Sequence, residues 1–251
     1  MEEPEQQLVL VTPVWNDSAR LAVFGPELAA MLAGQTIPVR WMVVDDGSSE
    51  DEVAALEKLV EAFRDVYPAV GLMHHAVRSR KGGAIRNAWD TFPEAAWLAF
   101  VDADGAISAD DLNRMFEETL ASEGEVAVVA IRRDSPERPV TRPAFRSLSF
   151  HVFTRLTRLL LRVPFADSQC GAKVISAAAY HKVRPQLEET GFAFDAELLL
   201  ALREIGCPIV EMPVTWTEKA NGRVHPLRDA WRMLAALLKI RRRSRAGHYK
   251  A

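Results

Sequence analysis

Short apolar runs and helical spacings alternate along the first half of the chain. Runs rich in valine, leucine and alanine predict buried strands at residues 8–13, 39–44, 70–74, 95–101 and 125–131. The segments between them carry helical periodicity or capping residues, which predicts helices at about 18–33, 50–67, 84–91 and 108–122. Strands separated by helices of this length predict an α/β fold, with a mostly parallel sheet covered by helices on both faces.

The second half of the chain has a different pattern. Residues 145–163 predict an amphipathic helix, with an apolar stripe and, on another face, Arg155, Arg158 and Arg162. After Pro164 comes an irregular stretch, followed by a helix at 194–205 and an extended segment at 208–217. Pro226 begins a last helix that ends in the basic run 239–245. The two amphipathic helices could lie on an anionic membrane surface or pack against the sheet.

Composition narrows the class of protein. The chain has 251 residues, 49% of them hydrophobic, which is enough for a sizeable core. A net charge of −3 gives no case for nucleic-acid binding. Cys170 and Cys207 lack the spacing of a metal site, and reduced thiols fit a cytoplasmic protein. Residues 1–7 are acidic and unlike a signal peptide, and no apolar run approaches about 18 residues. We therefore expect any membrane contact to be peripheral.

Polar residues follow several of the predicted strands. In parallel sheets, ligands bind beyond the carboxyl ends of the strands. Asp102 and Asp104 directly follow the run 99–101, and two such carboxylates can share a hard cation, Mg²⁺ or Mn²⁺, with phosphate oxygens. The alternative is a solvated turn with a helix cap nearby. Asp45 and Asp46 end another strand and could bind a base or ribose, although Asp and Gly are also common in turns.

Further polar groups lie outside these strand ends. Lys81 precedes two glycines and a predicted helix, where a phosphate could approach the backbone, although a simple glycine-rich turn fits equally well. The segments 167–171 and 194–197 hold polar residues among apolar neighbours, and a helix cap is the alternative for Asp195. We expect Cys170 to be a packing residue. Four arginines have the geometry to bind a phosphate, or form a solvated charge run: Arg132, Arg133, Arg142 and Arg146.

Together these motifs resemble glycosyltransferase family 2, whose members have the Rossmann-like GT-A fold. The resemblance includes residues 11–17 (VTPVWND), 44–48 (VDDGS), 81–84 (KGGA) and 102–104 (DAD). The segments 167–173 (DSQCGAK) and 194–197 (FDAE) are similar to the polyprenyl-phosphate glucosyltransferase branch. Asp17 stands where the family usually has Glu. The resemblance implies one GT-A domain over 1–245, with a nucleotide-sugar half at 8–132, an acceptor half at 133–245 that carries the amphipathic helices, and a tail at 246–251.

The resemblance also implies roles for individual residues. It implies that the nucleotide sugar is bound by Pro13, Asn16, Asp17, Asp45, Asp46, Lys81 and Asp102. Asp104, with Asp102, would bind Mg²⁺ or Mn²⁺. The candidate catalytic residues facing the sugar or acceptor are Asp195, Gln169 and Asp167. The candidates for binding an acceptor phosphate are Arg132, Arg142, Arg146 and Arg223.

The family implies an inverting transfer, with UDP-glucose as donor and a polyprenyl phosphate at the membrane surface as acceptor. A phosphate acceptor is largely dianionic at neutral pH, whereas a sugar hydroxyl needs a general base, for which Asp195 or Asp167 is the candidate. The alternatives are a GDP-mannose donor, a soluble sugar hydroxyl as acceptor, nucleotidyl transfer, and an inactive protein that binds membrane surfaces.

Overall fold

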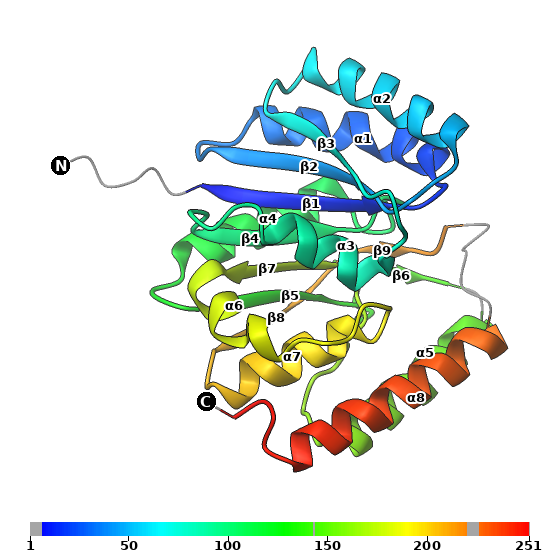
Figure 1. Ribbon diagram of the computed structural model, residues 1–251, viewed down its shortest axis with the longest axis vertical. Coiled ribbons are helices and arrows are strands. Elements are labelled where there is room, and N and C mark those ends of the chain that lie inside the picture. The colour runs from blue at the N-terminus through cyan, green and yellow to red at the C-terminus, as the bar shows by residue number, and fades with distance from the viewer. Residues whose placement is uncertain (1–6, 143, 220–225, 251) are drawn as a thin grey trace.

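The centre of the molecule is a seven-stranded sheet with the strand order β3-β2-β1-β4-β7-β5-β8 (Figure 1). The computed structural model describes residues 7–142, 144–219 and 226–250. The sheet strands are β1 (Leu8–Val14), β2 (Val39–Asp45), β3 (Val70–His74), β4 (Trp97–Val101), β5 (Ala127–Ile131), β7 (Ala172–Ser176) and β8 (Ile209–Pro213). Neighbouring strands are parallel except where β7 pairs with β4 and β5. The predicted α/β class with a mostly parallel sheet is confirmed.

Helices cover both faces of this sheet. One face packs against α1 (Ser18–Ala33), α2 (Glu50–Arg64) and α4 (Ala109–Ala121). The other packs against α3 (Arg80–Trp89), α6 (Ala177–Val183) and α7 (Phe194–Glu204). Successive side chains of a strand point to opposite faces, so Leu8 and Leu10 of β1 enter the first core and Val9 and Val11 the second. Burial on both faces explains why the strands are continuous apolar runs.

Strand β7 and helix α6 are absent from the elements that the sequence pattern predicted. The strand has only five residues, and Lys173 interrupts its apolar run. Lysine is almost never fully buried unless it is paired. Here the Lys173 side chain is fully buried, and its ammonium group pairs with Asp195. Pattern alone therefore could not identify a central strand at this position.

Helix α3 begins earlier than the sequence predicted. The prediction was a helix over 84–91 preceded by a glycine turn that a phosphate approaches, whereas the helix starts at Arg80 and includes both glycines. A Cβ on Gly82 would lie 2.4 Å from Cβ of Phe194 and 3.1 Å from the carbonyl oxygen of Glu189. The predicted start of the helix was wrong because the missing side chain at Gly82 allows α3 to pack closely against the start of α7. Binding of a phosphate near Lys81 stays a prediction.

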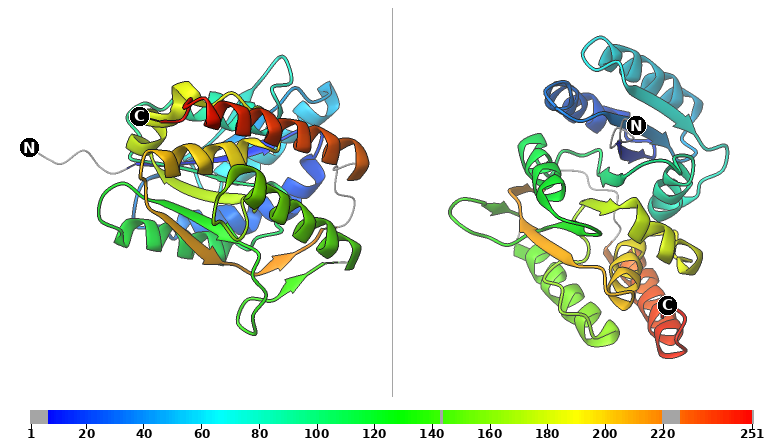
Figure 2. Two further views of the ribbon diagram at one scale, coloured as in Figure 1. Left: turned by 90° about the horizontal axis from the view of Figure 1, so that it is seen from below. Right: turned by 90° about the vertical axis from the view of Figure 1, so that its left-hand side faces the viewer.

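The remaining elements lie outside the seven-stranded sheet. A short parallel ladder joins β6 (Val140–Thr141) to β9 (Trp216–Thr217), and a 3-10 turn, η1 (Arg184–Gln186), follows α6. Helices α5 (Ala144–Leu161) and α8 (Pro226–Arg245) pack against each other at the opposite end of the molecule from α1 and α2 (Figures 1 and 2). Within the described parts of the chain, none of the helices combines the length and apolar character needed to cross a bilayer.

Candidate active site

Segments from both halves of the sequence meet at the end of the sheet where its parallel strands terminate. Parallel strands β1, β2 and β4 end there, followed by Asn16, Asp46 and Asp102 respectively. Because β7 is antiparallel, it begins at this same edge, so the segment 167–171 that precedes it reaches the site. The backbone N–H of Asp102 donates to the carbonyl of Gly171 at 2.9 Å. The fold thus brings the predicted catalytic segment beside the predicted metal ligands.

Asn16 and Asp45 order the loop after β2. The backbone N–H of Asn16 donates to Oγ of Ser48 at 2.8 Å, and Ser49 N–H donates to Oδ1 of Asn16 at 2.8 Å. Oδ1 of the buried Asp45 accepts from Ser48 N–H at 3.2 Å. Asn16 has a φ of 48°, in the left-handed region that Asn tolerates better than most residues. The loop that these hydrogen bonds order forms one wall of a pocket.

This pocket has a volume of about 340 Å³. The residues that line it come from the ends of β2 and β3 and from α2: Asp45, Gly47, Ser48, Val53, His74, His75 and Ala76. Nδ1 of His74 lies 3.6 Å from Oδ2 of Asp45. The two histidines were not among the predicted site residues, although their position at the end of β3 follows the same rule that singled out Asp45.

Two other predicted nucleotide ligands have specific partners within the protein. Oδ1 of Asp46 accepts from N–H and Oγ–H of Ser79, at 2.6 and 2.7 Å, and so fixes the residue that precedes α3. Asp17 lies 3.5 Å from Nη1 of Arg20, which is also 3.8 Å from Oδ2 of Asp104. Asp17 is therefore placed close to the proposed metal ligand. Pro13 lies in β1, one residue before its end.

Asp102 and Asp195 are joined by Lys81. Nζ of Lys81 lies 2.9 Å from Oδ1 of Asp102 and 3.5 Å from Oδ2 of Asp195. Burial alone would lower the pKa of Lys81, but these two carboxylates outweigh it and raise that pKa above its ordinary value. Burial raises the pKa of Asp102, against the opposing effect of Lys81. Lys81 thus stays a cation beside the two carboxylates.

Asp195 is almost completely buried and does not cap α7. Its Oδ1 accepts a 2.5 Å hydrogen bond from Nζ of Lys173, and its Oδ2 faces Lys81. Lys173 also donates to the carbonyl of Cys170 at 2.9 Å. Both oxygens of Asp195 therefore face ammonium groups. Removing either lysine would leave part of a buried carboxylate without a partner, which is costly.

Asp102 and Asp104 provide carboxylate oxygens, which are the ligands that a hard cation prefers. Both side chains are partly exposed, and Oδ1 of Asp104 accepts from Ala106 N–H at 3.0 Å. A Cβ on Gly171 would lie 2.1 Å from Oδ2 of Asp102, so only glycine leaves room for this carboxylate. The described residues contain no ready-made group of three or more metal ligands. The pair fits Mg²⁺ or Mn²⁺ when phosphate oxygens complete the coordination.

Asp167 forms a bidentate pair with Arg132. Nε of Arg132 donates to Oδ2 of Asp167 at 2.6 Å and Nη2 to Oδ1 at 2.9 Å. Burial opposes ionisation of Asp167, but Arg132 lowers its pKa below the usual value. Asp167 is therefore a weak base that orients a guanidinium group. Oδ1 of Asp167 also accepts from Gln169 N–H at 3.0 Å, while Nε2 of Gln169 is buried without a partner among the described residues.

Cys170 lies between these polar residues but is fully buried. Burial, reinforced by the nearby carboxylate of Asp167, raises the pKa of the thiol to about 12. Thiolate is the nucleophilic form of cysteine, and almost none is present at neutral pH. The expectation that Cys170 is a packing residue agrees with this environment.

Next to the Arg132–Asp167 pair lies a basic cleft of about 880 Å³, between the segment after β5 and helix α5. Its cationic and imidazole side chains are Arg132, Arg133, Arg142, His151, Arg155 and Arg158, and its acidic residue is Asp134. The guanidinium groups of Arg132 and Arg142 both contact the ring of Phe150, at 4.6 and 4.2 Å from its centroid. Burial and the neighbouring Arg132 lower the pKa of Arg142, as expected where like charges gather without enough anions.

The cleft includes two of the four predicted phosphate ligands, Arg132 and Arg142. The side chain of Arg146 and the whole of Arg223 lie outside the described residues. Three α5 residues that line the cleft, His151, Arg155 and Arg158, were not among the predicted site residues. Their spacing of four and three places them on one helical face, a signal that was present in the sequence.

Comparison with known proteins identifies the chemistry of this fold. The chain is 28% identical to dolichyl-phosphate beta-glucosyltransferase of Homo sapiens over 262 residues, covering 99% of this chain and 79% of that protein. It is 26% identical to glycosyltransferase AglD of Haloferax volcanii, covering 93% of this chain but only 36% of that longer protein.

Solved structures with the same fold include glucosyl-3-phosphoglycerate synthase from Mycobacterium tuberculosis in complex with Mn²⁺, UDP and phosphoglyceric acid. It has a TM-score of 0.68 at 14% identity, covering 96% of this chain and 79% of that one. Mannosyl-3-phosphoglycerate synthase from Rubrobacter xylanophilus has a TM-score of 0.67 at 18% identity, with coverage of 97% and 76%. The family model for glycosyl transferase family 2 matches residues 10–184. The chain is a glycosyltransferase and belongs to this family.

Proposed function

We propose that this enzyme transfers glucose from UDP-glucose to a polyprenyl phosphate, with inversion at the anomeric carbon. The observation that carries the proposal is the pairing of its carboxylates. Asp167 is held by Arg132, and Asp195 is held between Lys173 and Lys81. Neither is free to take a proton from a hydroxyl acceptor. The cleft beside them is lined by arginines, which suits an acceptor that is already anionic.

In this mechanism an acceptor phosphate oxygen attacks the anomeric carbon of glucose, and the bond from that carbon to the diphosphate breaks. The acceptor is largely dianionic at neutral pH, because its second pKa is near about 6, and it needs no general base. Arg142 and the cleft face of α5 would hold the acceptor phosphate. Gln169, whose amide nitrogen lacks a partner, would bind a sugar hydroxyl.

The donor side must stabilise the departing UDP. Asp45, Asn16 and the pocket beside them would bind the nucleoside. Asp104 and Asp102 would hold Mg²⁺ or Mn²⁺, which supplies positive charge to the diphosphate. Lys81, which remains protonated, would add a second cation next to the leaving group. Asp102 would then bind the metal and orient Lys81.

We also propose that α5 and α8 contact an anionic membrane surface that contains the acceptor. Val152, Leu156 and Leu159 recur along one stripe of α5 and are exposed, the last of them by 63%. On α8, Trp231 and Leu238 are 72% and 50% exposed. These residues leave apolar side chains in water beside the arginines of the cleft and of the basic run 239–245. Apolar and cationic side chains together favour an anionic bilayer interface.

The test is transfer by purified protein with Mn²⁺ from UDP-glucose to polyprenyl phosphate in detergent micelles. We expect a glucosylated lipid whose anomeric configuration, from the proton coupling constant, is opposite to that of the donor. Polyprenol without phosphate should give no product, since the chain would then have to supply a base. Transfer to polyprenol, transfer from GDP-mannose in preference to UDP-glucose, or retention of configuration would each contradict a stated part of the proposal.

A further inference from the structure

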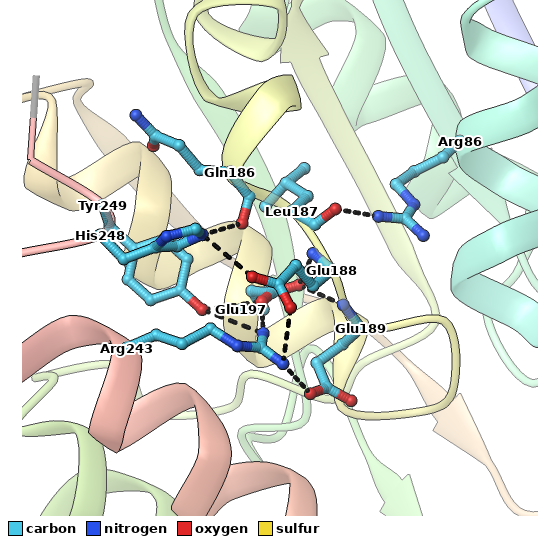
Figure 3. A network of polar contacts seen from close by, with 9 residues as sticks. All are labelled: Arg86, Gln186, Leu187, Glu188, Glu189, Glu197, Arg243, His248 and Tyr249. Atoms are coloured by element: carbon cyan, nitrogen blue, oxygen red, sulfur yellow. Dashed lines mark hydrogen bonds and ion pairs between the residues drawn. The ribbon is translucent and has the colours of Figure 1, made fainter. Parts of the chain in front are cut away.

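A polar network joins the C-terminal part of the chain to the loop before α7 (Figure 3). At its centre is Glu197, whose side chain is fully buried. Its Oε2 accepts from the backbone N–H groups of Glu188 and Glu189 at 2.9 and 2.7 Å. Its Oε1 accepts from Nη1 of Arg243 at 2.6 Å and from the hydroxyl of Tyr249 at 2.7 Å. Four donors from two separate segments thus satisfy one carboxylate.

The C-terminal segment holds this loop through additional contacts. Nη2 of Arg243 lies 3.0 Å from Oε1 of Glu189 and 3.3 Å from Oε2 of Glu188. Nε2 of His248 lies 2.9 Å from the carbonyl oxygen of Gln186. Tyr249 itself is fully buried. Residues at the end of α8 and just after it therefore hold the loop 187–193 along one side.

Helix α3 packs against the other side of the same loop. Gly83 N–H donates to the carbonyl of Thr190 at 3.2 Å, and the guanidinium of Arg86 donates to the carbonyl of Leu187. The close approach of Gly82 to Glu189 and Phe194 leaves no room for a side chain. The loop therefore contacts the C-terminal residues on one side and helix α3 on the other.

This first turn carries Lys81, and the loop leads directly into Asp195. The 3.5 Å contact between Lys81 and Asp195 depends on how α3 and α7 start relative to each other, whereas the 2.9 Å contact between Lys81 and Asp102 depends on how α3 lies against the end of β4. We propose that Glu197, Arg243 and Tyr249, the C-terminal clamp, are positioning residues that hold loop 187–193 so that Lys81 and Asp195 keep this geometry. The catalytic consequence rests on the proposed function, in which Lys81 stabilises the leaving diphosphate.

The clamp is tested first by hydrogen exchange, which does not depend on catalysis. Tyr249→Phe removes one hydroxyl, and we expect about fivefold faster exchange in peptides covering 187–193 and 79–86. Tyr67→Phe is the matched control, because the Tyr67 hydroxyl donates to the carbonyl of Val39 near the β3 edge of the sheet. Unchanged exchange in loop 187–193, or equal acceleration throughout the sheet, would overturn the proposal.

Kinetics then connect the clamp to the site. In Tyr249→Phe we expect kcat to fall about fivefold, with KM for UDP-glucose changed less than twofold, well below the melting temperature. Arg243→Met should lower kcat further and Arg243→Lys should recover part of it, since lysine keeps the charge but not the two-pronged contact. A kcat per folded molecule equal to that of the wild type in all three variants would refute positioning. Absence of transfer by the wild type would refute the proposed function, while the exchange result would still decide the clamp.

Discussion

The ends of β1, β2 and β4, here called the donor edge, carry Asn16, Asp45, Asp102 and Asp104. This donor edge lies next to the basic cleft, but the two regions are built from opposite charges. At the donor edge, Asp102 and Asp104 are partly exposed carboxylates, with Lys81 and Arg20 as their cationic neighbours. In the cleft, arginines outnumber acidic residues, and Asp167 is used to orient Arg132. Under the proposed function, the donor diphosphate would be held through a metal cation, whereas the acceptor phosphate would be bound directly by arginines. We therefore expect substitutions at the donor edge and in the basic cleft to affect donor and acceptor binding separately.

The largest effect is expected at the donor edge. Asp104→Asn should lower kcat by about 100- to 1,000-fold, because the variant loses charge that holds the metal against the departing diphosphate. Steady-state kinetics at saturating Mn²⁺ would measure this loss. Asp110→Asn, at an exposed position on α4, is the control and should retain activity. A similar kcat for Asp104→Asn and the wild type would place the metal elsewhere.

Substitutions in the basic cleft should change KM for the acceptor. Arg142→Met removes a charge-assisted contact, and we expect KM for polyprenyl phosphate to rise about tenfold to 100-fold. The KM for UDP-glucose should stay within about twofold, since the variant leaves the donor edge unaltered. Arg64→Met on the exposed side of α2 provides the comparison. An equal rise in the two KM values would show that the cleft and the donor edge are not separate sites.

The exposed stripe of α5 should matter for membrane binding, and Leu159, which also lines the basic cleft, should affect KM for the acceptor as well. Leu159→Asp should weaken cosedimentation with vesicles containing phosphatidylserine by about tenfold, because a buried leucine contributes roughly 1.5–3 kcal/mol. Val23→Asp is the matched control, since Val23 is 78% exposed on α1 at the opposite end of the molecule. If both variants lost binding equally, the added negative charge, and not the position of Leu159, would explain the loss. If binding to the vesicles does not weaken as salt is added, the arginines do not contribute to it through charge.

The smallest effect concerns pH. The pKa of Asp167 is lowered in the native state, so its contribution to stability is complete above the unfolded-state value, near about 4. That contribution is lost as the pH falls through the lower native pKa. Urea unfolding should therefore show little change from this group between pH 7 and about 5, and a decline under more acidic conditions. Asp167→Asn should lower stability at pH 7 and reduce this acid dependence.

The sequence placed Asp45 and Asp102 at the ends of parallel strands, because these residues follow apolar runs with a clear pattern. Apolar runs before Asp45 and Asp102 were sufficient to place both at one edge, since parallel strands end together. The same reasoning failed for the start of α3, because its two glycines were assigned to a turn before the helix. Their role depends on Phe194 and Glu189, more than a hundred residues away, and local spacing does not encode that contact.

The sequence by itself determined the α/β class, the five strand runs of the first half and the acidic residues at their ends. These follow from periodicity and from the residues next to each strand. Only the tertiary structure decided that the antiparallel β7 brings Asp167 and Gln169 to the same edge, that Lys173 pairs with Asp195, and that Glu197 meets Arg243 and Tyr249. A buried charge is stabilised by its spatial partners, and residues far apart in sequence become partners only when the chain has folded.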